Sequence, residues 1–355
     1  MLECSPLQPI ETEAAGINLF GRRVLFAVLF VLAVAVLVSP RPRKFIAVFL
    51  AIIVIFCLLD QTRWQPWVFL YGFLMATLAL FSWDSGDVAG RNRTLNIARL
   101  IMAGTYLFSG LQKINLNFMQ NEFPWIVSPI TDVVPAAAPA LHWLGVAAPF
   151  IQVAFAVGLL THRFRRMSLI VAVAMHVFIL CMFGPFGLNW NNTIWPWTAA
   201  MAMLDILLFT GKQKFSWHDI VWSGRNPYHA SVLVVFIGLP LLSFFNLWDS
   251  YLSAALYSGN ITEAEIYTND RGKNSLPESF TAHLVHTSED TNVLNIQRWA
   301  IEDLNVMPYP EVRVYKKIAK DVCLHLRNPA DLVLLVREHR LFFSKPETGY
   351  RCWQL

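Results

Sequence analysis

A lysine at the end of an apolar stretch is the residue of this chain best placed to do chemistry. Lys113 lies in the run GLQKIN, residues 110–115. Apolar surroundings disfavour an ammonium group and therefore lower the pKa of a lysine. A lysine that is neutral near pH 7 can accept a proton from a substrate, so Lys113 is a candidate general base. The alternative is an anchor, with the stem of Lys113 in lipid and its ammonium among the headgroups.

A histidine in the middle of another apolar stretch is the second candidate. His176 is flanked on both sides by Ala, Val, Met and Phe, and no residue of its own helix can pair with it. An ionisable residue at such a position often contacts a ligand or relays a proton. The alternative is a neutral histidine that is hydrogen-bonded to another helix.

A cluster of asparagines follows the histidine-containing stretch. Asn189, Asn191 and Asn192 come directly after two glycines and a proline, which end a helix. Amide side chains can bind the polar groups of a ligand, so these residues are predicted to form the lip of a ligand site. A solvated turn is the alternative.

Asp60 and Trp64 mark the end of an earlier apolar stretch. Asp60 is predicted either to pair with Arg63 or to hold a loop near Lys113. Trp64 belongs to a set of tryptophans expected at one membrane interface. Both residues are therefore included as candidate ligand contacts. Asp205 is expected only at the edge of its helix.

The composition indicates an all-α polytopic membrane protein. Hydrophobic residues make up 55% of the 355 residues and charged residues only 15%, which is difficult to reconcile with a wetted surface. Eight stretches are predicted to span a membrane as a bundle: Leu19–Val38, Phe45–Leu59, Trp67–Trp83, Leu95–Leu111, Leu141–Leu160, Ser168–Phe183, Ile194–Phe209 and Ser231–Trp248. Residues Asn121–Ala140 are too broken by prolines to span, and an interfacial or re-entrant segment is expected there.

The loop charges predict the orientation. Most basic residues of the short loops fall on one side, which the positive-inside rule places in the cytoplasm. The expected location is the cell inner membrane, with the N-terminus and the C-terminal domain extracytoplasmic. The predicted parts are an N-terminal tail (1–18), a transmembrane domain (19–248) and a C-terminal domain (249–355). Residues 1–16 lack a basic start and an apolar core, so no cleavable signal peptide is expected.

The C-terminal part has an ordinary mixed composition and is predicted to be a small α+β domain. Asn292–Leu304 and Glu311–Leu324 are expected to be helices, and Asp331–Arg337 a buried strand. Cys323 and Cys352 are expected to be either disulfide-bonded, if this part is extracytoplasmic, or free. The domain could bind a protein or peptide partner.

Several classes of function are disfavoured. No basic stripe with interleaved aromatic residues is present, so no nucleic-acid partner is expected. The five cysteines form no CxxC pair, and no His, Cys and Asp cluster has ligand spacing, so no metal is expected. A transporter is disfavoured because the sequence has no inverted repeat.

Three segments together resemble a known family. They are LDQTRW (59–64) with the following LYG (70–72), GLQKIN (110–115), and His176 with the following Phe186-Gly187. Their order and spacing, over about residues 45–209, resemble the vitamin K-dependent γ-glutamyl carboxylases and the related horizontally transferred transmembrane (HTTM) domain. DoxX-like membrane proteins, which are linked to quinones, are a more distant resemblance.

The resemblance implies a quinone or hydroquinone ligand, like vitamin K, and carboxylase-like or oxygenase-like chemistry. In the carboxylases the lysine that matches Lys113 deprotonates the hydroquinone, and oxygenation then gives a base that removes a proton from a glutamate. Two departures limit the match. Trp67 stands where the carboxylases carry a histidine, and their large lumenal domain has no counterpart in this sequence. The competing hypothesis is a non-enzymatic membrane scaffold, or a partner-binding protein in peptide maturation or immunity to a peptide toxin.

Overall fold

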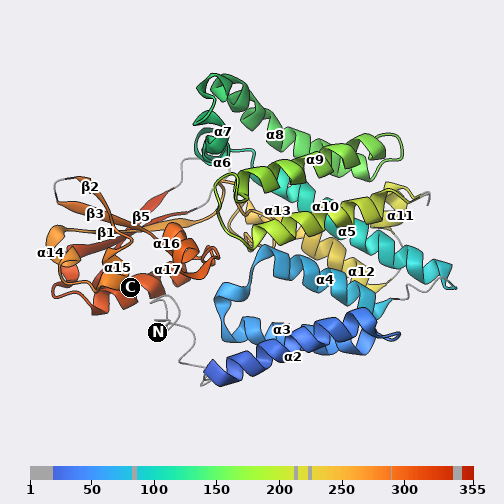
Figure 1. The fold of residues 1–355 in the computed structure, drawn as a ribbon, viewed down its shortest axis with the longest axis horizontal. Helices are drawn as coiled ribbons and strands as arrows, with labels where there is room; N and C mark the ends of the chain where they lie inside the picture. The colour runs from blue at the N-terminus through green and yellow to red at the C-terminus, as the bar shows by residue number, and fades with distance from the viewer. Residues whose placement is uncertain (1–18, 82–85, 212–214, 223–225, 289, 339–345) are drawn as a thin grey trace. The chain divides into compact units, whose positions relative to one another are not determined.

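The chain forms two compact units, one mainly helical and one containing a β-sheet (Figure 1). The computed structural model describes residues 19–81, 86–211, 215–222, 226–288, 290–338 and 346–355. The predicted N-terminal tail, residues 1–18, lies outside the described residues. The helical unit consists of residues 28–53 and 65–260. The second unit consists mainly of described residues between 261 and 355, together with residues 19–27 and 54–64.

Long apolar helices account for most of the first 210 residues. They are α2 (Leu19–Val38), α3 (Arg43–Leu59), α4 (Pro66–Leu80), α5 (Val88–Gln112), α8 (Ala138–Leu159), α9 (Arg165–Phe183) and α10 (Ile194–Phe209). These ranges agree closely with six of the predicted stretches, and α5 contains a seventh. Leu and Ala, which are frequent in these stretches, are good helix formers. The proline-rich segment between α5 and α8 is broken, as predicted. It forms η3 (Phe118–Glu122), α6 (Phe123–Ile126), α7 (Ser128–Thr131) and η4 (Pro135–Ala137).

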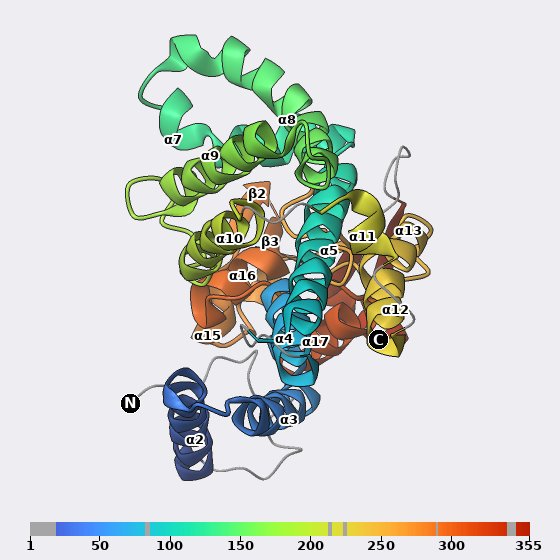
Figure 2. The same cartoon turned by 90° about the vertical axis from the view of Figure 1, so that its right-hand side faces the viewer.

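Helix α5 lies at the centre of the helical unit (Figure 2). It contacts α4, α8, α10, α11 (Trp217–Val221) and α12 (Pro227–Leu233). Its fully buried side chains, among them Ile97, Ile101 and Met102, form the middle of the hydrophobic core. Helix α8 approaches closely at Gly110, where an added Cβ would lie 2.8 Å from a methyl group of Val153. Only glycine permits this approach.

The predicted eight-span membrane bundle is wrong, and so is the prediction of a multi-pass membrane protein. Within the described residues, two helices are long and apolar enough to cross a membrane, Pro135–Leu159 and Arg165–Phe183. A helix rises about 1.5 Å per residue, so the 15 residues of α4 and the 16 of α10 reach only about 22–24 Å. A hydrocarbon core is about 30 Å thick.

Two further helices depart from the predicted spans. Helix α5 begins earlier than expected and carries Arg91, Arg93 and Arg99. The last predicted span, 231–248, is a shorter helical stretch than predicted, from Pro227 to Ser243, and it is irregular. It consists of α12, the π-helical turn η5 (Val234–Gly238) and α13 (Pro240–Ser243). The apolar stretches therefore predicted helices correctly but not membrane crossings, because hydropathy does not measure how far a continuous helix extends.

The second unit is built on a five-stranded antiparallel sheet of order β2-β3-β1-β4-β5. The strands are β1 (Glu263–Thr268), β2 (Val285–Ser288), β3 (Thr291–Asn295), β4 (Leu332–Arg337) and β5 (Glu347–Arg351). Buried and partly exposed residues alternate along β1 and β4, as expected when one sheet face is covered. The core under that face contains side chains of α16 (Ile296–Leu304) and α17 (Val312–Leu324), including Trp299 and Tyr315. Three shorter helical segments, α14 (Asp270–Lys273), α15 (Glu278–Thr281) and η6 (Pro329–Asp331), complete the unit.

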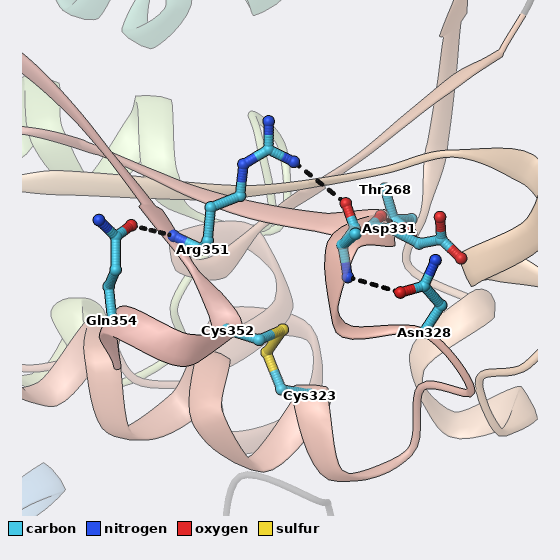
Figure 3. The surroundings of a disulfide bond; sticks show 8 residues. Thr268, Cys323, Asn328, Asp331, Arg351, Cys352 and Gln354 are labelled. Atoms are coloured by element: carbon cyan, nitrogen blue, oxygen red, sulfur yellow. Dashed lines mark hydrogen bonds between the residues drawn. A yellow bond between two sulfur atoms is a disulfide. The ribbon is translucent and has the colours of Figure 1, made fainter.

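A disulfide bond links helix α17 to the C-terminal turn of this unit (Figure 3). Cys323 of α17 is bonded to Cys352 of η7 (Cys352–Gln354), and their Cα atoms are 5.9 Å apart. The predicted helix over Asn292–Leu304 is correct only from Ile296, as α16, because residues 292–295 belong to strand β3. The second predicted helix and the predicted strand correspond to α17 and β4, and the bonded alternative for the two cysteines holds. The bond closes a loop of 29 residues that includes β4 and β5.

Candidate functional site

A cavity of about 440 Å³ lies inside the helical unit. Its volume falls within the range of small-molecule sites, about 300–1,000 Å³. Most of its lining is aromatic or aliphatic and comes from α4, α5, α8, α9 and α10; examples are Phe69, Phe108, Phe155, Phe178, Trp197 and Met201. A lining of this kind suits a flat or branched apolar ligand and excludes most water.

Several polar residues of the cavity lie along α5. Tyr106, Ser109 and Lys113 all line it. Spacings of three and four residues place side chains on one face of a helix, so these three form a stripe that faces the apolar wall. Of these three residues, the sequence predicted Lys113. Tyr106 was missed, although its position seven residues before Lys113 placed it on the same helix face.

Lys113 is held at the end of α5. It is the C-cap residue of the helix, and its Nζ donates hydrogen bonds to the carbonyl oxygen of Ser109 at 3.0 Å and to Ser109 Oγ at 2.6 Å. Burial beside the apolar cavity lowers the pKa of Lys113 to about 7, and the negative charge of Glu122 opposes this shift. A substantial fraction of Lys113 is therefore neutral near pH 7.

His176 belongs to a buried three-residue network. Its Nε2 lies 2.7 Å from the hydroxyl of Tyr106 on α5, and that hydroxyl donates to Oδ2 of Asp205 on α10 at 2.8 Å. Burial, and then the Asp205 carboxylate, raise the pKa of Tyr106 well above its ordinary value, so the hydroxyl keeps its proton. His176 and Tyr106 line the cavity, and α9, α5 and α10 each contribute one member.

Asp205 is not the edge residue that the sequence predicted. Its exposed fraction is 0%, because α10 packs against α5 and α9 and turns this carboxylate into the protein. The expectation failed because distance from a helix end says nothing about which side of the helix is covered.

The asparagines after α9 do not form the predicted lip. Asn189 and Asn192 are exposed, and neither they nor Asn191 line the cavity. Asn191 is buried and donates to the hydroxyl of Tyr257 at 3.1 Å, so it reaches the cavity only through that lining residue. Asn189 and Asn191 have φ of 48°, a left-handed conformation that asparagine tolerates, and the solvated-turn alternative describes this segment better.

Asp60 and Trp64 lie in the sheet-containing unit and not in the helical unit. Asp60 caps the turn η2 (Gln61–Arg63), accepting hydrogen bonds from Thr62, and forms an ion pair with Arg63 at 3.0 Å. The predicted pairing with Arg63 is therefore present. Trp64 is partly buried at the end of the same turn.

The asparagines that follow Lys113 donate hydrogen bonds to backbone carbonyl oxygens. Asn115 donates to the carbonyl oxygens of Gln112 and Ser258, and Asn117 donates to that of Gly259. Gly259 has φ of +65°, and a Cβ there would lie 2.7 Å from the backbone nitrogen of Phe118. These contacts hold the segment around residue 259 against the chain that leaves α5.

No group of three or more His, Cys, Asp and Glu residues that could hold a metal ion occurs within the described ranges. No model of a known protein family, no functionally described protein and no solved structure matches the chain.

Proposed function

We propose that the chain is an enzyme that binds a quinone- or hydroquinone-sized lipophilic molecule and uses Lys113 as a general base. The observation that carries the proposal is the amine of Lys113, which lies at the wall of a large apolar cavity and has a pKa of about 7. General bases work best when their pKa lies near the operating pH.

The hydrogen bonds of Lys113 support a proton-accepting role. A neutral amine has two N–H groups and one lone pair. The two N–H groups are accounted for by the two hydrogen bonds to Ser109, which leaves the lone pair to accept a proton. In the proposed step the Nζ takes a proton from a ligand hydroxyl, giving an ammonium group and an oxyanion whose charges attract each other.

The shape of the cavity supports a flat, lipophilic ligand. Aromatic side chains from several helices, among them Phe155 and Trp197, offer faces for a ring. His176 of α9 and Tyr106 of α5 place a second polar group in the wall. An aromatic diol has polar groups at the edges of an apolar ring, and this pattern fits the lining.

The resemblance of three sequence segments to the vitamin K-dependent carboxylases agrees with this proposal. Lys113 and His176, from two of these segments, both line the cavity. Of the third segment, residues 59–64 belong to the other unit, whereas Leu70 lines the cavity. We propose the reaction as far as removal of a proton from the ligand. The deprotonated ligand would then react with oxygen, either alone or coupled to the carboxylation of a glutamate by carbon dioxide.

Contact with membrane lipid is proposed only for α8 and α9. Large apolar side chains are exposed on both helices, including Trp143 (71%), Phe150 (52%) and Ile170 (69%). Lipid in contact with these helices would supply a lipophilic ligand at high local concentration. Localisation in the inner membrane stays a prediction.

The test uses a naphthohydroquinone as the probe under oxygen. Base-assisted oxidation consumes one O₂ for each hydroquinone and yields the quinone and hydrogen peroxide, so oxygen uptake reports the rate. Lys113→Ala is expected to lower the protein-dependent rate by about 10²–10⁴-fold. Lys113→Arg should fail as well, since a guanidinium stays protonated. Mass spectrometry of lipid extracted from the purified wild type should also detect a bound quinone.

Lys320→Ala is the matched control, because Lys320 is exposed on α17 of the other unit. It should leave the rate unchanged. Each variant is compared with the wild type for yield and thermal unfolding. Equal rates for the wild type, Lys113→Ala and Lys113→Arg would show that Lys113 is not a base.

A partner-binding protein is the second candidate. A hollow of about 290 Å³ in the sheet-containing unit is lined by Met307, Pro308 and Tyr309 and by the basic residues Arg313 and Lys317. Such a lining suits a peptide with apolar and acidic side chains. In that case Lys317→Glu, and not Lys113→Ala, would abolish the activity of the protein in cells.

A further inference from the structure

We infer that Tyr106 and Asp205 are positioning residues that fix His176 in one tautomer, with the proton on Nε2, so that Nδ1 is a hydrogen-bond acceptor for a ligand hydroxyl. The ligand in this inference is the one in the proposed function, and to that extent the inference rests on that function. The tautomer itself can be tested without any ligand.

The direction of the hydrogen bonds fixes the tautomer. A carboxylate can only accept, so the single hydroxyl proton of Tyr106 is donated to Asp205 Oδ2 at 2.8 Å. The tyrosine oxygen then has only lone pairs left for His176. At 2.7 Å from that oxygen, Nε2 must be the donor. A neutral imidazole carries one proton, so its Nδ1 is left as a bare acceptor.

The free nitrogen has no partner among the described residues. Nδ1 of His176 is buried and makes no hydrogen bond there, and the whole residue is only 4% exposed. Buried polar atoms are nearly always hydrogen-bonded, so an exception needs an explanation. His176 lines the cavity, and a ligand hydroxyl donating to Nδ1 supplies one.

The network restricts rotation of the imidazole ring. His176 on α9 cannot turn its ring without breaking the hydrogen bond to Tyr106 of α5. Asp205 of α10 holds the tyrosine hydroxyl, and its Oδ2 lies 3.6 Å from Nε2 of His176. The ring of Tyr106 also packs edge-on against Phe155, with centroids 5.3 Å apart. Asp205 and Tyr106 therefore act on a ligand through His176.

The two acceptors come from different helices that meet at the cavity. His176 of α9 is hydrogen-bonded to Tyr106 of α5, and Lys113 follows seven residues later, with its Nζ reaching back to Ser109. The neutral amine of Lys113 and the Nδ1 of His176 both lack a proton to donate to the ligand. A ligand with a hydroxyl at each end satisfies both groups, whereas one with only carbonyl oxygens satisfies neither.

Nitrogen NMR of protein labelled with ¹⁵N-histidine tests the tautomer directly. The chain has nine histidines, and the signals of His176 are those lost in His176→Gln. At alkaline pH the wild type should show a protonated Nε2 and an unprotonated Nδ1. Tyr106→Phe keeps the packed ring and removes the hydroxyl, and it should yield a mixture of tautomers. In Asp205→Asn the amide can donate to the tyrosine oxygen, which allows the opposite tautomer.

Thr105→Val is the control for these variants. Thr105 also lines the cavity on α5, but its hydroxyl donates to the carbonyl oxygen of Ile101 in its own helix. This variant should keep the wild-type tautomer. A protonated Nδ1 in the wild type overturns the inference, and so does an unchanged signal in Tyr106→Phe.

Binding measurements separate this inference from the proposed function. A naphthohydroquinone, kept reduced without oxygen, should bind Tyr106→Phe about tenfold more weakly than the wild type. The matching naphthoquinone should lose little. Binding that needs Lys113 but is unaffected in Tyr106→Phe overturns the inference alone. Failure of the wild type to bind either probe overturns both.

Discussion

The helical unit buries basic side chains in two places, and it treats them differently. At one, Lys113 lies at the wall of an apolar cavity and hydrogen-bonds to the carbonyl oxygen and the hydroxyl of Ser109. At the other, Arg99 and Arg165 are almost fully buried, 2% and 7% exposed, on either side of a phenylalanine ring. Lys113 loses much of its charge, whereas the arginines keep theirs.

The arginine pair is fully engaged in holding the fold. The guanidinium carbons of Arg99 and Arg165 lie 3.7 and 3.5 Å from the centre of the Phe215 ring. Arg99 donates to the carbonyl oxygen of Leu208 at 2.9 Å, and Arg165 to that of Leu159 at 3.3 Å. These carbonyls belong to the last turns of α10 and α8, where a positive charge is favourable.

The comparison separates a structural cation from a reactive amine. Desolvation, with Arg165 nearby, lowers the pKa of Arg99 only to about 10, so it stays charged in neutral solution. Desolvation brings Lys113 to about 7. Burial alone therefore does not mark a functional cation. What distinguishes Lys113 is its position at the wall of a cavity, where its hydrogen bonds go to Ser109 of its own helix. Arg99 and Arg165 instead stack on an aromatic ring and donate to carbonyls at the ends of other helices.

The largest expected contrast is in stability. Arg99→Met removes the ring contact and leaves a helix-end carbonyl without its partner, so it should lower the free energy of unfolding by about 2–4 kcal/mol. Lys113→Met removes a poorly solvated amine and should change that free energy by less than about 1 kcal/mol. Denaturant unfolding measures both. Arg99→Lys keeps the charge without the planar fork and should not rescue. Equal losses for both methionine variants would contradict the distinction.

The pH dependence of stability should differ in the same way. The folded pKa of Lys113 is about 7, below its ordinary value of 10.5, so between these values the unfolded chain binds a proton that the folded chain does not. Stability therefore rises with pH in this window. Across this window the free energy of unfolding of the wild type should rise by about 1–2 kcal/mol relative to that of Lys113→Met. This is less than the full difference in pKa would give, because the side chain is partly exposed. A flat difference across the window would mean that Lys113 is solvated.

The smallest expected effect concerns Ser109. Its hydroxyl accepts from Lys113 and stabilises the ammonium more than the amine. Ser109→Ala should therefore lower the pKa of Lys113 and move the midpoint of the pH profile of oxygen uptake to lower pH by less than about 1 unit. In the wild type the rate should rise with pH through about 7 and then level off. A shift of the midpoint to higher pH would contradict the proposed contact.

Sequence reasoning identified the two cavity residues that stand out locally. Lys113 and His176 were predicted because each is an ionisable residue next to apolar neighbours, which can be read without knowing the fold. Asn189, Asn192 and Asp60 were selected on polarity alone, and the structure places none of them at the cavity. The eight-span bundle failed for a related reason, since hydropathy identifies apolar helices without measuring their continuous length.

The sequence by itself determined where the helices α2 to α5 and α8 to α10 form, and that Lys113 and His176 lie in apolar surroundings. Helix formation and hydropathy depend on residues within a few turns of each other. Only the tertiary structure decided that Tyr106 meets His176 and Asp205, which are 70 and 99 residues away, and that Lys113 faces a cavity. These contacts depend on which faces of distant helices pack together, and no local pattern specifies that choice.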